Sequence, residues 1–294
     1  MRCLVMGVVN VTPDSFFDGG RYLDPDAAIA HGLELVAEGA DLVDVGGEST
    51  RPGADPVSEH EELRRVLPVV EALAPHVRVS IDTTKRAVAE AAIERGATLV
   101  NDESSSLGSC AAGAGVGLVV MHMQGTPRDM QIDPRYDDVV GEVSASLVRR
   151  AAAARDAGVE ELYVDPGIGF GKTVAHNLAL LGALPGLVAL GEPVLVGTSR
   201  KSFIGRILAA QGEPPLPPSE RLEGSLATAV FAAASGVAML RVHDVRATVQ
   251  AVQLVGEAGA PGSADRCGAP RAGHARGTVG SGRGPAEMPA GAVG

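Results

Sequence analysis

The sequence predicts an α/β fold of the (βα)8 TIM barrel class, with the functional site at the C-terminal ends of the strands. Over residues 1–258, eight short apolar runs alternate with longer helical patterns. A polar or glycine-rich segment follows each run, and in a closed barrel all eight of these segments meet at one mouth. The rival fold is an open doubly wound sheet, in which only the strands near the switch point carry such segments.

Each predicted strand is a short apolar run, and each predicted helix is a longer amphipathic stretch. The strands cover Cys3–Val9, Leu42–Val45, Val77–Ile81, Thr98–Val100, Leu118–Met121, Leu162–Val164, Val194–Val196 and Met239–Val242. The helices cover Pro25–Glu38, Ser58–Leu73, Lys85–Arg95, Tyr136–Ala157, Val174–Leu184, Lys201–Ala210 with Glu220–Ala234, and Val245–Glu257. Gly39, Gly96 and Gly158 follow helices and suit their C-terminal caps. Residues 103–117 are poor helix formers, so we expect no helix there and an exposed barrel flank.

Residues 259–294 differ in composition from the rest of the chain. They contain ten glycines and four prolines, and they lack Leu, Ile, Phe and Tyr. Such a segment cannot bury enough apolar surface to offset its conformational entropy. We therefore predict a barrel over residues 1–258 and a disordered tail over residues 259–294.

The composition excludes several classes of protein. A net charge of −11 without a basic run argues against nucleic-acid and membrane-surface binding. No apolar run reaches the ~18 residues that a transmembrane helix needs. Cys3, Cys110 and Cys267 are far apart and odd in number, which argues against a disulfide framework or a zinc site. We expect a cytoplasmic enzyme that holds any anionic ligand through local positive charge.

The glycine-rich segment 165–173 resembles a phosphate-binding loop only superficially. A Walker A loop requires glycine where Pro166 stands, and the dinucleotide-binding fingerprint fails because Lys172 occupies its last glycine position. Asp165, at the end of a predicted strand, is the informative residue of this segment.

Carboxylates and amides follow several of the predicted strands. Asp82, Asn101 and Asp165 come after the third, fourth and sixth strands, and a carboxylate there can accept adjacent N–H donors from a heterocycle. Asn10 ends the first strand and supplies a hard oxygen of the kind that Mg²⁺ accepts. The alternatives are that Asp82 caps the following helix and that Asn101 is an ordinary loop residue.

Cations and hydroxyls follow the second, seventh and eighth strands. Residues 44–53 place a glycine pair before hydroxyls and an arginine, and residues 198–202 place two cations among hydroxyls at a helix start. Arg241 and His243 share one side of their strand, although a structural ion pair with Asp244 is an alternative. Together these groups predict a ligand with a heterocycle at one end and a phosphate or pyrophosphate at the other.

Taken together, these residues resemble the dihydropteroate synthase family. The similarity lies in blocks that run in family order over residues 4–257: Met6–Gly20, Asp44–Ala54, Val79–Thr83, Asn101-Asp102, Met121–Gly125, Asp165–Lys172, Ser199–Gly205 and Arg241–Val245. Several blocks are weak singly, but together they are highly specific. The resemblance implies the joining of 6-hydroxymethyl-7,8-dihydropterin pyrophosphate to 4-aminobenzoate, which gives 7,8-dihydropteroate and pyrophosphate in folate biosynthesis. Because the pterin ring can delocalise positive charge, such an enzyme must chiefly stabilise the departing oxyanion.

The resemblance also implies roles for residues at the matching positions. The pterin contacts are Asp82, Asn101, Asp165 and Lys201, with Asp165 facing the 2-amino/N3 edge. The apolar lining and rim are Met121, Phe170 and Gly197. The pyrophosphate site is Arg241 and His243, and the Mg²⁺ ligand is Asn10. The aminobenzoate side is Thr50, Arg51, Pro52, Lys201 and Ser202. The implied catalytic residues are Lys201, Arg241, His243, Asp14 and Arg51, of which Asp14 and Arg51 lie on loops that close over the substrates.

Two departures from the family pattern concern the region between the fourth and fifth strands. Glu103 takes a position where an apolar residue is expected, and the interval from Asn101 to His122 is short. Two alternatives stay open. One is a methyltetrahydrofolate-using barrel, which shares the pterin carboxylates but needs no anion site. The other, which these departures suggest, is a catalytically silent barrel that binds pterin or a partner protein. For the synthase we expect small-molecule substrates and a homodimer.

Overall fold

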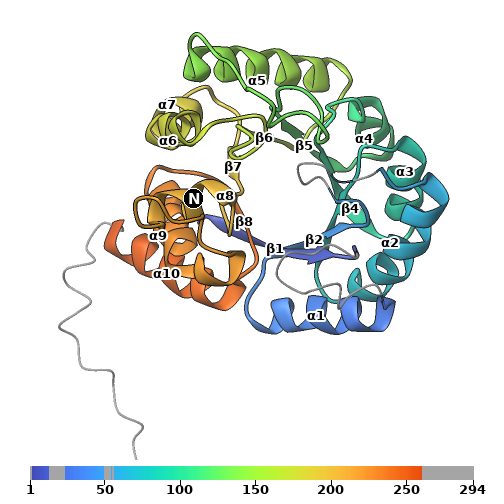
Figure 1. Cartoon of the computed structure of the whole chain (residues 1–294). Helices are drawn as coiled ribbons and strands as arrows, with labels where there is room; N and C mark the ends of the chain where they lie inside the picture. The colour runs from blue at the N-terminus through green and yellow to red at the C-terminus, as the bar shows by residue number, and fades with distance from the viewer. Residues whose placement is uncertain (1, 13–23, 50–53, 55, 260–294) are drawn as a thin grey trace, which may run out of the picture. The chain divides into compact units, whose positions relative to one another are not determined.

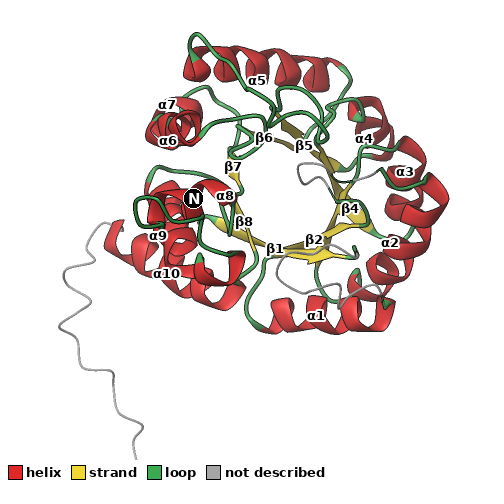
Figure 2. Cartoon of the chain, viewed as in Figure 1, coloured by secondary structure: helices red, strands yellow, loops and turns green. Residues whose placement is uncertain are grey.

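The computed structural model describes residues 2–12, 24–49, 54 and 56–259, which fold as a barrel of parallel strands inside a ring of helices (Figures 1 and 2). The strands are β1 (Leu4–Asn10), β2 (Leu42–Gly46), β3 (Arg78–Asp82), β4 (Ala97–Asp102), β5 (Gly117–Met121), β6 (Leu162–Asp165), β7 (Leu195–Val196) and β8 (Met239–Val242). Each lies at a predicted position. Residues 260–294 of the predicted tail lie outside the described residues.

The strand order is that of a barrel. Neighbouring strands pair in parallel in the order β6-β5-β4-β3-β2-β1-β8-β7. The two ends of this sheet meet through a parallel bridge between Val164 and Val194, where the Val164 amide donates to the Pro193 carbonyl at 2.9 Å. The sheet is therefore a nearly closed barrel, which confirms the predicted fold over the open doubly wound sheet.

The helices follow the strands, as predicted. They are α1 (Pro25–Ala37), α2 (Glu59–Leu73), α3 (Arg86–Glu94), α4 (Gly108–Ala114), α5 (Val139–Asp156), α6 (Val174–Gly182), α7 (Leu184–Val188), α8 (Ser202–Leu208), α9 (Leu222–Ala234) and α10 (Val245–Gly259), with a 3-10 turn η1 (Pro218–Glu220) before α9. The predicted helix Val174–Leu184 corresponds to α6, and the short helix α7, which was not predicted, follows it with Pro185 in its first turn. Gly39, Gly96 and Gly158 have φ of 101°, 107° and 96°, which confirms their predicted place at helix ends.

The prediction that residues 103–117 form no helix is wrong. Helix α4 occupies part of this segment and ends at Gly115, which takes the left-handed conformation (φ 66°). The Asp102 carboxylate accepts the Leu107 amide at 2.7 Å just before the helix begins. Cys110 and Ala111 of α4 are buried, so tertiary packing overrides the poor intrinsic helix propensity. The barrel flank between β4 and β5 is therefore covered, and both strands are paired on each side.

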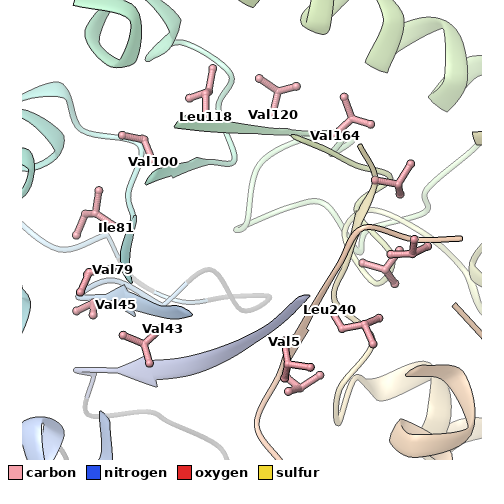
Figure 3. Packing of buried hydrophobic residues seen from close by; sticks show 14 of the residues in the cluster. Val5, Val43, Val45, Val79, Ile81, Val100, Leu118, Val120, Val164 and Leu240 are labelled. Carbon is pink, nitrogen blue, oxygen red and sulfur yellow. The ribbon is translucent and has the colours of Figure 1, made fainter. Parts of the chain in front are cut away.

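The core has an inner and an outer part. Side chains such as Val43, Ile81, Val120 and Leu240 point outward from the strands and pack under the helices (Figure 3). A smaller cluster fills the barrel interior; it consists of Met6, Leu42, Leu99, Val119, Tyr163, Leu195 and Met239.

This inner cluster determines where the functional side chains lie. Because side chains alternate along a strand, the residue two positions after an inner residue also faces the interior. Leu99 is thus followed on the same face by Asn101, and Tyr163 by Asp165. The apolar cluster fills the N-terminal half of the barrel, and the polar residues line the C-terminal half.

Candidate functional site at the C-terminal mouth of the barrel

The predicted site residues meet at one end of the barrel. Strand register places Asn10 opposite Gly46, Gly46 opposite Asp82, and Asp82 opposite Asn101, so these four residues form one row across β1 to β4. A cavity of ≈ 570 Å³ opens at this end. The predicted residues that line it are Asn10, Asp82, Phe170, Gly197, Lys201, Ser202, Arg241 and His243.

Three of the other predicted residues are described and do not line this cavity. Asn101, Met121 and Asp165 are buried outside its lining, at 7%, 3% and 7% exposure. Asp14, Thr50, Arg51 and Pro52 lie outside the described residues. Glu48 and Ser49, which immediately precede Thr50, do line the cavity.

A buried ion-pair network joins four strands at the mouth. Arg241 of β8 donates from Nε to Asp44 Oδ2 at 2.6 Å and from Nη2 to Asp82 Oδ2 at 2.7 Å. Asp44 Oδ2 also accepts the Asn101 side-chain amide at 3.0 Å. A guanidinium has five N–H donors, so two of these bonds leave three donors that can reach a ligand in the cavity.

This network overturns both alternatives for Asp82 and Arg241. Asp82 does not cap helix α3; Thr83 Oγ1 instead accepts the Lys85 amide at 3.1 Å. Asp244 is paired with Arg200: Arg200 Nε lies 2.8 Å from Asp244 Oδ2. Asp244 is therefore not the partner of Arg241. Both predicted site residues are therefore directed into the mouth.

Carboxylates outnumber the cations that face them around Arg241. Burial raises the pKa of Asp82 well above its usual value, the Asp44 carboxylate raises it further, and Arg241 opposes the shift. Glu103, which is buried with 6% exposure, also raises the pKa of Asp82. The pKa of Arg241 is raised because Asp44 and Asp82 outweigh the effect of burial. The carboxylates of the mouth thus present oxygen acceptors to a ligand rich in N–H donors.

Asp165 and Lys201 form the second charged group of the mouth. Asp165 Oδ1 accepts the Gly167 amide at 2.7 Å. Burial raises the pKa of Asp165, and Lys201 is the strongest opposing influence. Burial lowers the pKa of Lys201 to about 8, and Asp165 opposes that shift.

The position of Lys201 depends on the glycine-rich turn after β6. Its Nζ donates to the Ile168 carbonyl and lies 4.4 Å from the centre of the Phe170 ring. Gly169 has φ 89°, and a Cβ there would lie 2.7 Å from Lys201 Cδ. Glycine at this position therefore permits both the turn and the close approach of the lysine.

A strained residue precedes Lys201. Arg200 has φ 58°, a conformation that costs a non-glycine residue about 1–2 kcal/mol. Its amide donates to Ser225 Oγ at 2.9 Å, and its carbonyl accepts Arg221 Nη1 at 2.8 Å. With the Asp244 ion pair, these bonds hold the backbone turn that directs Lys201 into the mouth.

His243 has a hydrogen-bonded neighbour of its own. The backbone amide of His243 and its Nδ1 lie 3.2 and 3.0 Å from Ser199 Oγ. This contact joins the end of β8 to the loop after β7, and both residues line the cavity.

Sequence reasoning missed Asp44, Lys172 and a second buried network. Asp44 has 0% exposure inside a strand of apolar residues, and that context was the available signal. Lys85 Nζ binds Glu48 and, at 2.5 Å, the fully buried Glu62. Nothing in the spacing of Lys85, Glu48 and Glu62 pointed to this network.

Two features are absent from the part of the chain that the structure describes: a cluster of metal-binding side chains and a membrane-spanning helix. Within them, no group of three or more His, Cys, Asp or Glu side chains is arranged to hold a metal ion. None of the described helices has both the length and the apolar character needed to span a bilayer.

Comparison with known proteins identifies the class of this barrel. The family model described as "Pterin binding enzyme" matches residues 6–243. The dihydropteroate synthase of Mycobacterium leprae is 50% identical over 261 residues, which cover 86% of this chain and 92% of the relative.

Two solved structures of Xanthomonas albilineans dihydropteroate synthase match the fold closely. The one with 4-aminobenzoic acid has a TM-score of 0.79 and 48% identity, and covers 88% of this chain and 94% of the other. The one in complex with 7,8-dihydropteroate has a TM-score of 0.77 and 45% identity, and covers 88% and 95%. The fold and site thus define a pterin-binding barrel enzyme. More particularly, the chain belongs to the dihydropteroate synthase family, which transfers a pterin group.

Proposed function

We propose that the chain joins 6-hydroxymethyl-7,8-dihydropterin pyrophosphate to 4-aminobenzoate, giving 7,8-dihydropteroate and pyrophosphate in folate biosynthesis. The observation that carries this proposal is the arrangement of the mouth. Arg241, His243 and Lys201 line the cavity, where they can receive an anion, and Asp82 lines it as well. Asn101 and Asp165 are buried near the ends of β4 and β6, outside the cavity lining, and complete the proposed pterin end. Relatives of this family are known with 4-aminobenzoic acid and with 7,8-dihydropteroate, the second substrate and the product of this reaction.

The buried carboxylates suit the pterin end. Asp165 accepts the Gly167 amide with Oδ1, which fixes the carboxylate and leaves acceptor capacity for the 2-amino and N3 donors of the ring. Asn101 is held by Asp44, and Asp82 by Arg241, so the polar groups that would meet the ring are already oriented. Met121, Phe170 and Gly197 supply the remaining pocket surface in this proposal.

Arg241 and His243 suit the leaving group. In the reaction, the bond between the methylene carbon and the pyrophosphate oxygen breaks with the electron pair on oxygen. The amine nitrogen of 4-aminobenzoate then bonds to that carbon and loses a proton to solvent. Arg241 retains three N–H donors for the oxygens on which charge develops, and such contacts act in the transition state.

Lys201 and Ser202 suit the side of the cavity where 4-aminobenzoate would enter. Ser202 is the first residue of α8 and is exposed at the cavity, and Lys201 lies over the Phe170 ring. Thr50, Arg51, Pro52 and Asp14 are proposed to complete this side from loops outside the described residues.

Asn10 is the proposed Mg²⁺ ligand. Its amide lines the cavity at the end of β1, and the described residues offer no dense ligand cluster. That donor set fits an ion held by one protein oxygen, water and the phosphate oxygens of a substrate, which is how Mg²⁺ commonly binds. When bound, the ion would neutralise charge on the pyrophosphate as it leaves. Asn10→Ala should therefore raise the Mg²⁺ concentration needed for half-maximal turnover.

We further propose a cytoplasmic homodimer with no nucleic-acid or membrane partner. Leu178 of α6, Ile207 and Leu208 of α8, and Phe231 of α9 are 47–49% exposed on adjacent helices, which supports an apolar contact between two copies. Cys3 and Cys110 are buried free thiols, as expected of a reducing compartment. Light scattering of the wild type and of Ile207→Asp tests the dimer, which the charge should dissociate.

The test of the reaction is release of pyrophosphate by the purified protein. Release should require both the pterin pyrophosphate and 4-aminobenzoate, and mass spectrometry should find dihydropteroate in equal amount. A methyltetrahydrofolate-using enzyme would release no pyrophosphate, and a silent barrel would bind pterin without turnover. The comparisons favour the synthase over both.

A further inference from the structure

A buried lysine holds the turn that follows β6. Lys172 has 3% exposure, and its Nζ donates to the carbonyl oxygens of Gly167 at 2.9 Å, Phe170 at 3.0 Å and His122 at 3.2 Å. The same nitrogen lies 3.1 Å from His122 Nδ1. One ammonium thus gathers acceptors from the turn after β6 and from the end of β5.

The turn held by Lys172 carries the amide that orients Asp165. Gly167 donates its N–H to Asp165 Oδ1 at 2.7 Å and offers its carbonyl to Lys172. Gly167 has φ 64°, and a Cβ there would lie 1.9 Å from the His122 carbonyl oxygen. The turn therefore sits directly against β5, and the lysine binds groups on both sides of this contact.

The charge of Lys172 also acts on Asp165. Burial raises the pKa of Asp165, and it is opposed by Lys201, by the Gly167 amide, and then by Lys172 and Arg241. The cations that face this carboxylate thus come from the turn, from the start of α8 and from β8. Removing one of them leaves Asp165 protonated up to a higher pH.

The surroundings of Lys172 define the pH range in which its charge is present. Burial lowers the pKa of Lys172 to about 7; Asp165 opposes this shift, whereas Lys201 and Arg150 add to it. Burial and the neighbouring Lys172 also lower the pKa of His122 to about 4, so the imidazole is neutral and can accept from Lys172 at Nδ1. At pH 6 the lysine is therefore charged and the histidine is not.

We propose that Lys172 is a positioning residue for pterin binding, which fixes the Gly167 amide on Asp165 and supplies a countercharge to that carboxylate. This inference rests on the proposed function, in which Asp165 accepts the donors of the pterin ring. Lys172 acts through Asp165 and the turn, and it is not a catalytic residue.

The test measures the affinity of 6-hydroxymethyl-7,8-dihydropterin by calorimetry at pH 6 and pH 8. Lys172→Met should raise Kd about tenfold or more at pH 6, because both the turn and the countercharge are lost. The increase should be smaller at pH 8, where Lys172 of the wild type is largely neutral. Lys172→Gln retains a donor without charge, so it should approach wild-type affinity at pH 8 and remain weak at pH 6. If Lys172→Met does not fold, the comparison of Lys172→Gln with the wild type at the two pH values still tests the role of Lys172.

Tyr136→Phe is the matched control. Tyr136 donates to the Gly171 carbonyl of the same turn at 2.9 Å, but it has no bond to the Gly167 and Asp165 pair. Its Kd should stay within about twofold of the wild type at both pH values. Equal losses at pH 6 and pH 8 in both lysine variants, or no loss in either, would overturn the inference. Absence of pterin binding by the wild type would instead overturn the proposed function.

Discussion

Arg241 offers the sharpest test of the network at the mouth. It is paired with Asp44, which has 0% exposure, and with Asp82, so Arg241→Ala leaves two buried carboxylates facing each other. Removing one partner from a buried ion pair costs about 3–5 kcal/mol. For a domain of this size each 1 kcal/mol lowers Tm by roughly 2–4 °C, so we expect a fall of about 6–20 °C.

The electrostatic origin of that loss has two signatures. Burial and Asp44 already raise the pKa of Asp82, and without Arg241 it should rise further. An acid whose pKa is raised by folding lowers the free energy of unfolding at high pH. This loss becomes smaller as the pH falls toward the pKa that the acid has in the unfolded chain. The loss in free energy of unfolding caused by Arg241→Ala, measured in urea against the wild type, should therefore be smaller at pH 5 than at pH 8. It should also be about 1–3 kcal/mol smaller when Asp44→Asn is already present. A deficit independent of pH and additive with Asp44→Asn would refute this reasoning.

Three further predictions concern the walls of the site, and a fourth concerns helix α4. Asp165→Asn should weaken binding of a bare pterin by about 1–3 kcal/mol in calorimetry, because an amide N–H would face ring donors; unchanged affinity would remove Asp165 from the pterin site. The His122 ring should stay neutral in NMR titration until the pH approaches its lowered pKa of about 4, whereas titration near 6.5 would mean that the ring is solvated. Gly167→Ala should abolish folding or pterin binding, since its Cβ would lie 1.9 Å from the His122 carbonyl oxygen. Gly113→Ala, exposed in α4 with nothing near its Cβ, should instead stabilise the protein by about 0.5–1 kcal/mol in urea unfolding.

Hydrophobic pattern was sufficient to predict the strands, because each must present apolar side chains to the helices outside. Val43, Ile81 and Val120 do so, and the intervening residues face the interior. The same alternation explains why polar residues near the strand ends lie on the inner face, at the mouth. Helix α4 was not predictable, since Asp102 and the burial of Cys110 stabilise a segment of low helix propensity.

The interior partners of the site were beyond the reach of sequence patterns. Asp44 and Arg241 are far apart in the chain and meet only because the barrel closes. The role of Lys172 depends on carbonyl oxygens, which every residue carries and no motif displays. Arg200 likewise gives no sign in the sequence of its left-handed backbone, which is set by its bonds to Ser225 and Arg221.

In the proposed function, the mouth has a pterin end and a separate pyrophosphate end. His243→Ala tests it most directly, because His243 lines the cavity and its Nδ1 lies 3.0 Å from Ser199 Oγ in the loop after β7. The measurement is turnover of the pterin pyrophosphate beside the Kd of 6-hydroxymethyl-7,8-dihydropterin, in wild type and variant. We predict that turnover falls about a hundredfold, as for loss of one contact to a developing oxyanion, while the Kd is unchanged. A parallel loss of both would contradict the division of the site into two ends.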